Sequence, residues 1–225
     1  MLTTLLFIAV LAAAATDWVA VAKGWRKIET IAKPVTMVLL FSYLGLTGGF
    51  GATPLICFGL GILFSLAGDL FLLFSDRWFI AGLVSFLLAH VAYIIGLNTP
   101  FGELSPLWAI GIGIILAITA ARLLRRILAG VREKGKPQLV VPVVAYGTVI
   151  TLMLLSAILT LSRLDWKISA AGLVSVGAIL FYASDIILAW NKFVKPVNNG
   201  RVLNMIAYHL GQIALVVGVV IQFAK

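Results

Sequence analysis

The chain has 225 residues, of which 62% are hydrophobic and 11% charged, and its mean hydropathy is +1.14. A soluble domain carries about 25% charged residues, so this composition excludes a water-soluble globular protein. The 17 Lys and Arg residues outnumber the 8 Asp and Glu residues. They lie in short segments between apolar runs, which is typical of membrane topology and not of nucleic-acid binding.

Eight apolar runs approach the length of about 20 residues that a helix needs to cross a hydrocarbon core. They cover residues 2–22, 34–50, 53–74, 79–98, 105–126, 139–161, 168–190 and 202–223. We interpret the first run as a spanning helix, because it is long for a signal peptide and no basic segment precedes it. Only the connection 122–137 has room for a small amphipathic element. The sequence predicts an all-α polytopic membrane protein with eight transmembrane helices in a single transmembrane domain, residues 1–225.

The basic residues are divided unequally between the two sides of this predicted bundle. One side carries Lys23, Arg26, Lys27, Lys33, Arg77, Arg122, Arg125, Arg126, Arg132, Lys134, Lys136, Lys192, Lys195 and Arg201. The other side, which also holds both termini, carries Arg163, Lys167 and Lys225. The positive-inside rule therefore predicts that both termini lie outside. The short loops suit a bacterial inner membrane.

A faint internal repeat relates the two halves of the chain. Gly68-Asp69 in the third run resembles Ser184-Asp185 in the seventh, and Pro34 and Pro142 stand at the openings of the second and sixth runs. These pairs are four spans apart and enter the membrane in the same direction. We interpret them as a possible parallel 4+4 internal repeat.

Several ionisable residues lie inside the apolar runs, where a charge costs about 2.5–3.5 kcal/mol on insertion scales. They are Asp17, Asp69, His90, Asp185 and His209. Further polar groups come from Lys33, Tyr93, Tyr146, Tyr182, Ser184, Tyr208 and Gln212. Most of them lie at a similar depth, roughly 9 Å from the basic side for a residue six positions inside a span. We expect a polar chamber that opens toward the basic side, with Lys33 at its rim.

Simpler roles remain open for several of these residues. Asp17 fits an interfacial position equally well, and Asp69 and Asp185 fit hydrogen bonding between helices. His209 and Tyr208 lie on different faces of one helix, and we favour Tyr208 as the residue that faces the chamber. No spacing of ligands indicates a metal, and no phosphate-binding loop or cofactor motif is present.

In their order along the chain, these polar motifs resemble those of the YhhN family of membrane proteins. The motifs are Lys33-Pro34, Gly68-Asp69-x-x-Leu72, Ala89-His90-x-x-Tyr93, Tyr146-Gly147, Ser184-Asp185-x-x-Leu188-Ala189 with Phe193, and Tyr208-x-x-Gly211-Gln212. The resemblance covers nearly the whole chain. It implies an eight-span lysoplasmalogenase-type hydrolase, which cleaves the vinyl ether bond of a lysophospholipid to a fatty aldehyde and a glycerophospho-alcohol.

The residues suit this chemistry, because protonating a vinyl ether carbon gives an oxocarbenium ion, as in glycoside hydrolysis by two carboxylates. We hypothesise that Asp69 and Asp185 are acid and base in an unassigned order, and that His90 positions water or relays protons. Substrate contacts are expected from Lys33 (to the phosphate), Tyr93, Tyr146, Ser184, Tyr208 and Gln212. A small-molecule or proton-coupled transporter is the alternative, because buried Asp and His also occur in carriers. The headgroup, chain length and oligomeric state stay open.

Overall fold

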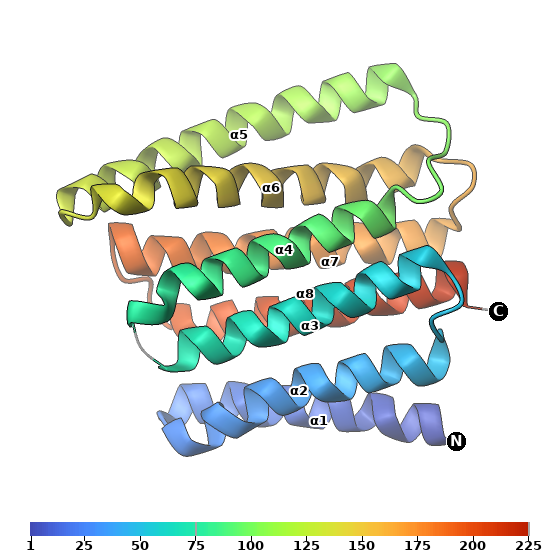
Figure 1. The fold of residues 1–225 in the computed structure, drawn as a ribbon, viewed down its shortest axis with the longest axis horizontal. Helices are drawn as coiled ribbons and strands as arrows, with labels where there is room; N and C mark the ends of the chain where they lie inside the picture. The colour runs from blue at the N-terminus through green and yellow to red at the C-terminus, as the bar shows by residue number, and fades with distance from the viewer. Residues whose placement is uncertain (75, 225) are drawn as a thin grey trace.

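The molecule is a bundle of long helices that run side by side (Figure 1). The computed structural model describes residues 1–74 and 76–224, and eight of the helices in this range are long and apolar enough to cross a membrane. They are α1 (Leu2–Lys23), α2 (Arg26–Thr47), α3 (Thr53–Phe74), α4 (Phe79–Leu97), α5 (Pro106–Glu133), α6 (Val140–Leu159), α7 (Ile168–Ala189) and α8 (Gly200–Phe223). Shorter segments are η1 (Asp76–Trp78), η2 (Pro137–Leu139), η3 (Thr160–Ser162) and the π-helical η4 (Trp190–Val194). The predicted all-α fold with eight spans is confirmed.

Two helices extend beyond the apolar runs that predicted them. Helix α2 begins at Arg26 instead of near residue 34, so Lys33 and Pro34 lie inside it and not at its opening. Its first turn can enter the bundle because the buried carboxylate of Glu29 accepts a 2.5 Å hydrogen bond from Arg201. Helix α5 continues through its arginines to Glu133, so this part of the connection 122–137 belongs to α5 and forms no separate amphipathic element.

Helix α8 is the centre of the bundle, since it packs against α1, α2, α3 and α7. It lies closest to α7, where a Cβ atom added to Gly177 would come within 2.8 Å of the carbonyl oxygen of Gly211. Small residues allow such close backbone packing in membranes, where association depends on van der Waals contact. Helix α5 is peripheral, because it contacts α6 and η4 and its most apolar window has no buried residue.

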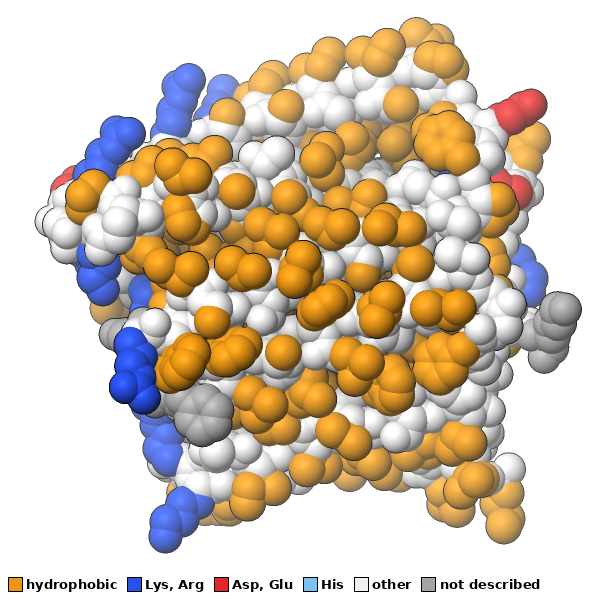
Figure 2. Space-filling view, in the orientation of Figure 1, with side chains coloured by type: hydrophobic (Ala, Val, Ile, Leu, Met, Phe, Trp, Pro, Cys, Tyr) orange, Lys and Arg blue, Asp and Glu red, His pale blue; other side chains and the backbone are white. Residues whose placement is uncertain are grey.

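The two ends of the bundle differ in charge. Both termini lie at one end (Figure 1), and Lys and Arg side chains gather at the opposite end (Figure 2). This separation agrees with an even number of spans and with the grouping of basic residues in the sequence. Lys225 lies outside the described residues. The orientation in the membrane and the 4+4 repeat stay predictions.

Candidate active site

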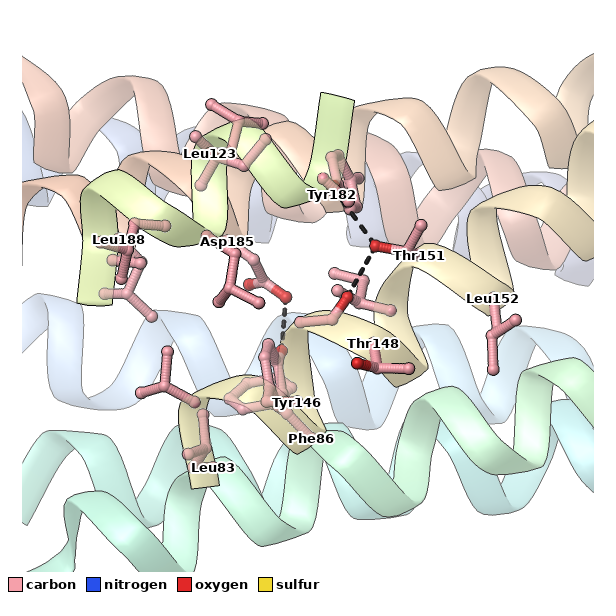
Figure 3. A pocket seen from close by; sticks show the side chains of 18 of the residues that line it. Leu83, Phe86, Leu123, Tyr146, Thr148, Thr151, Leu152, Tyr182, Asp185 and Leu188 are labelled. Atoms are coloured by element: carbon pink, nitrogen blue, oxygen red, sulfur yellow. Dashed lines mark hydrogen bonds between the residues drawn. The ribbon is translucent and has the colours of Figure 1, made fainter. Parts of the chain in front are cut away.

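An apolar pocket of about 400 Å³ lies among α4, α5, α6 and α7 (Figure 3). Helix α5 contributes small residues to one wall, Gly113, Ala117, Ala120 and Ala121. These positions share one face of the helix, because residues four, seven and eight apart point the same way. The small side chains leave the space that the pocket occupies, and mainly aliphatic and aromatic side chains form the rest of its lining.

Asp185 of α7 places a carboxyl group in this otherwise apolar lining, and its side chain is 13% exposed. The hydroxyl of Tyr146 on α6 donates a short hydrogen bond to its Oδ2 atom (Figure 3). His90 of α4 is fully buried, with Nε2 3.0 Å from the Tyr146 oxygen and 3.4 Å from Oδ2 of Asp185. Three helices therefore converge on one carboxyl group.

The hydrogen-bond roles in this triad follow from the single hydroxyl hydrogen of Tyr146. Since that hydrogen is directed at Asp185, the contact between His90 and Tyr146 requires Nε2 of His90 to be the donor. Among the residues that the structure describes, the partners of the Asp185 carboxyl group, Tyr146 and His90, both contact its Oδ2 atom. Its Oδ1 atom is therefore available to a molecule in the pocket.

Asp69 belongs to a second cluster, deeper in the bundle. Its Oδ1 atom lies 2.8 Å from the ammonium of Lys33, and its Oδ2 atom accepts a 2.7 Å hydrogen bond from Tyr208. Asp69 is completely buried and Lys33 is 6% exposed. The expectation that Lys33 lies at the rim of a chamber is therefore wrong, because α2 starts early and carries Lys33 into the bundle, where Asp69 compensates its charge.

Aromatic rings separate the two aspartate clusters. Phe181 packs against both His90 and Tyr208, with ring centroids 4.8 Å and 5.4 Å apart. Phe86 packs edge-on against both Phe181 and Tyr208. Among the described residues that line the pocket, Phe86 and Asp185 are present and Asp69 is not. The single polar chamber expected from the sequence is thus divided into two sites.

A third buried pair joins α1 to α8. Asp17 is fully buried between helices, and its Oδ2 atom lies 3.9 Å from Nδ1 of His209. Trp18 donates a 3.1 Å hydrogen bond to the same nitrogen. His209 faces α1 while Tyr208 faces Asp69, which confirms that the two neighbours occupy different faces of α8.

The remaining predicted site residues make hydrogen bonds inside the bundle. Tyr93 donates to Gln212 at 2.6 Å, and Gln212 donates to Ser65 at 2.9 Å. Ser184 accepts a 2.9 Å hydrogen bond from Asn204. These contacts join α3, α4, α7 and α8, and none of the five residues is among the described residues that line the pocket. In the part of the chain that the structure describes, no group of three or more His, Cys, Asp or Glu side chains could hold a metal ion.

Residues 28–219, which include both aspartate clusters and the pocket, match the model of the YhhN family. The chain belongs to the YhhN family. It is 29% identical to human Lysoplasmalogenase TMEM86B over 67% of this chain and 58% of that protein. It is 29% identical to mouse Lysoplasmalogenase TMEM86B over 86% of this chain and 75% of that protein. Identity to human Lysoplasmalogenase TMEM86A is 32%, over 71% and 63% respectively.

This YhhN protein spans less than two thirds of the length of the two human relatives that it matches. No solved structure gives a significant match to it. Asp17 and Trp18 on α1 lie before the region that the YhhN model covers. Both aspartates of the other two clusters lie within it.

The sequence did not indicate some of the candidate functional residues of this YhhN protein. Lys192 lines the pocket at its basic end, although the sequence suggests only a topological charge there. Its spacing from Asp185 was the available signal, because residues seven apart on a helix share a face. Asn204 and Ser65 carry no such signal, since small polar residues are common in spanning helices.

Proposed function

We propose that this protein is a membrane-embedded hydrolase that cleaves the vinyl ether bond of lysoplasmalogens. The products are a fatty aldehyde and a glycerophospho-alcohol, such as glycerophosphocholine or glycerophosphoethanolamine. The observation that carries the proposal is the carboxyl group of Asp185 in an apolar pocket, held by Tyr146 and His90. Membership of a family whose relatives include proteins named lysoplasmalogenases supports it.

The reaction consumes one water and needs a proton donor and a proton acceptor in turn. Protonated Asp185 gives its proton to the outer alkene carbon, which leaves an oxocarbenium ion beside the new carboxylate. Water adds to the carbon attached to oxygen, and the carboxylate takes a proton from it, so the acid is restored. The resulting hemiacetal breaks its carbon–oxygen bond to give the aldehyde and the alcohol. One carboxyl group can thus act first as acid and then as base.

The neighbours of Asp185 match the demands of each step. Tyr146 donates to the carboxylate that forms when the proton leaves, and His90 orients the Tyr146 hydroxyl by donating to its oxygen. The apolar lining takes the alkenyl chain and limits the access of bulk water to the cation. A role for both aspartates as in glycosidases would need Asp69 to reach the pocket. Its ion pair with Lys33 favours a positioning role behind Phe181 instead.

The test is aldehyde release from choline and ethanolamine lysoplasmalogens by the purified protein in detergent. Asp185→Asn removes the acid, and we expect the rate to fall by about 10²-fold or more, the usual contribution of general acid–base catalysis. Ser175→Ala is the matched control, because it deletes a buried hydrogen bond to Ala157 from the same helix without touching the pocket. It should retain most of the rate.

Two results would count against the proposal. A folded Asp185→Asn protein that releases aldehyde at the wild-type rate would exclude the carboxyl group from the chemistry. A folded wild-type protein that releases no aldehyde from either lipid would refute the hydrolase and favour transport of a small molecule.

A further inference from the structure

Lys192 brings a positive charge to one end of the apolar pocket. It belongs to the π-helical segment η4, a kind of helix distortion that occurs frequently at functional sites. Its ammonium lies 4.4 Å from the centroid of the Phe79 ring, and both residues line the pocket. Among the described residues in that lining, Lys192 is the one cation. The pocket therefore has an apolar body, a carboxyl group and a lysine at one end.

At this end of the pocket, the segment η4 lies close to the backbone of α5. Gly130 has no side chain, and a Cβ atom there would collide with the carbonyl oxygen of Phe193. Lys134, which directly follows α5, donates a 2.7 Å hydrogen bond to the carbonyl oxygen of Lys192. These contacts anchor η4 against α5, so the backbone that carries Lys192 is held in place at the basic end of the bundle.

The spacing of Asp185 and Lys192 matches the polar part of a lysophospholipid. They are seven residues apart, which corresponds to roughly 10 Å along a helix. In an alkenyl lysophospholipid about seven bonds separate the outer alkene carbon from phosphorus, or roughly 8–9 Å when extended. A lipid with its alkene carbon at Asp185 therefore carries its phosphate close to the level of Lys192 along the helix.

The direction of the lipid follows from the same lining. From Tyr146 the pocket wall on α6 continues through Ile150 and Leu152 to Leu155, away from the basic end. The nine residue steps from Tyr146 to Leu155 correspond to roughly 13 Å of apolar wall. A hydrocarbon chain fits in that direction, and the phosphate then faces the end of the bundle where Lys and Arg side chains gather (Figure 2). Lys33 is not among the described residues that line the pocket.

We infer that Lys192 binds the phosphate of a lysophospholipid whose hydrocarbon chain fills the apolar pocket. This inference rests on the proposed function for the placement of the alkene carbon at Asp185. It makes Lys192 a determinant of specificity, since an ether lipid without a phosphate would lose this contact and keep all the apolar ones. A single phosphate contact also leaves the alcohol beyond it uncontrolled, so choline and ethanolamine lipids are expected to bind alike.

A binding experiment with lipids that cannot be hydrolysed separates this inference from the reaction. The probes are a saturated 1-O-alkyl lysophosphocholine and the matching 1-O-alkylglycerol, which lacks the phosphate, each titrated into purified protein. Lys192→Met keeps the length of the side chain and removes its charge. We expect it to weaken binding of the phospholipid about 10- to 100-fold, as for a lost hydrogen bond between charged groups, and to leave the alkylglycerol unaffected. Lys192→Arg should restore binding, and the exposed Lys195→Met should change neither affinity.

The outcomes separate a phosphate site from a structural role. Equal weakening of both lipids by Lys192→Met would mean that the lysine supports the pocket, and no weakening of either would place the phosphate elsewhere; each result overturns the inference. If the phospholipid binds in a Lys192-dependent way and wild-type protein still releases no aldehyde from lysoplasmalogens, the phosphate site stands and the proposed reaction fails.

Discussion

The ion pair between Lys33 and Asp69 gives the most demanding test of the physical picture of this bundle. The ammonium and the carboxylate are 2.8 Å apart, with side chains that are 8% and 0% exposed. At an effective dielectric constant of about 20, two unit charges at this distance attract by about 6 kcal/mol, before the cost of desolvation is subtracted. Lys33→Met removes one partner and leaves a buried carboxylate with only the Tyr208 hydroxyl. We expect a loss of about 3–5 kcal/mol in the free energy of unfolding, as for other broken buried pairs.

The double variant Lys33→Met with Asp69→Asn is expected to recover most of that loss. An Asn side chain is neutral and keeps an oxygen that can accept the Tyr208 hydrogen bond, so no uncompensated charge remains. Unfolding would be followed in detergent micelles with increasing denaturing detergent. Lys27→Met is the control, because Lys27 is an exposed lysine in the same helix and should change stability by less than about 0.5 kcal/mol.

A cost of less than about 1 kcal/mol for Lys33→Met, or a double variant no more stable than the single one, would contradict a strong buried ion pair. The double variant also separates two roles for Asp69. If Asp69 only positions the bundle, the double variant loses far less aldehyde release than Asp185→Asn does. If Asp69 is itself the acid or base, the two lose activity to a similar extent.

Two further predictions concern the ends of the bundle. Gly130→Ala should cost about 1–3 kcal/mol of stability, because the new methyl group meets the backbone of Phe193, which cannot move aside. Gly111→Ala is the control in the same helix, since its new methyl group meets nothing within 4 Å and should not be destabilising. Equal thermal unfolding of the two variants would contradict this account. At the opposite end, hydrogen bonds from Arg163 lower the pKa of Asp165 below its ordinary 3.8, so this pair stabilises the fold above pH 3.8 and the stabilisation is lost as the pH falls further. Asp165→Asn should lower the free energy of unfolding at neutral pH by no more than about 1 kcal/mol, because the Asp165 side chain is 40% exposed. The variant should also lose less stability than the wild type as the pH falls below 3.8. If both proteins lose stability equally over that range, the Arg163–Asp165 pair does not cause the acid dependence.

The number and type of the helices could be predicted because a bilayer imposes a length on every apolar run. Their ends could not be predicted as well, since hydropathy does not report where backbone hydrogen bonding begins. Helix α2 starts with charged residues, and the buried Glu29 is tolerated there because Arg201, far along the chain, donates a hydrogen bond to it. Helix α5 likewise continues past its apolar run to Glu133.

The list of buried polar residues was predictable, but their grouping was not. Depth along a helix follows from residue number, so Asp69 and Asp185 were expected at one level. Their partners depend on how each helix is rotated about its axis and on which helices are neighbours. The rings of Phe181 and Phe86, which divide the expected chamber, read in the sequence as ordinary apolar residues.

The two aspartates differ most in the kind of partner that each has. Lys33 contributes a charge, so its ion pair with Asp69 exists only while that carboxyl group is ionised. Tyr146 can donate or accept through its hydroxyl, so its contact with Asp185 can persist whether that carboxyl group carries a proton or not. A group that gives up and regains a proton in each catalytic cycle needs partners of the second kind. The partners of Asp185, together with its place in the pocket lining, make it the residue on which the proposed chemistry depends.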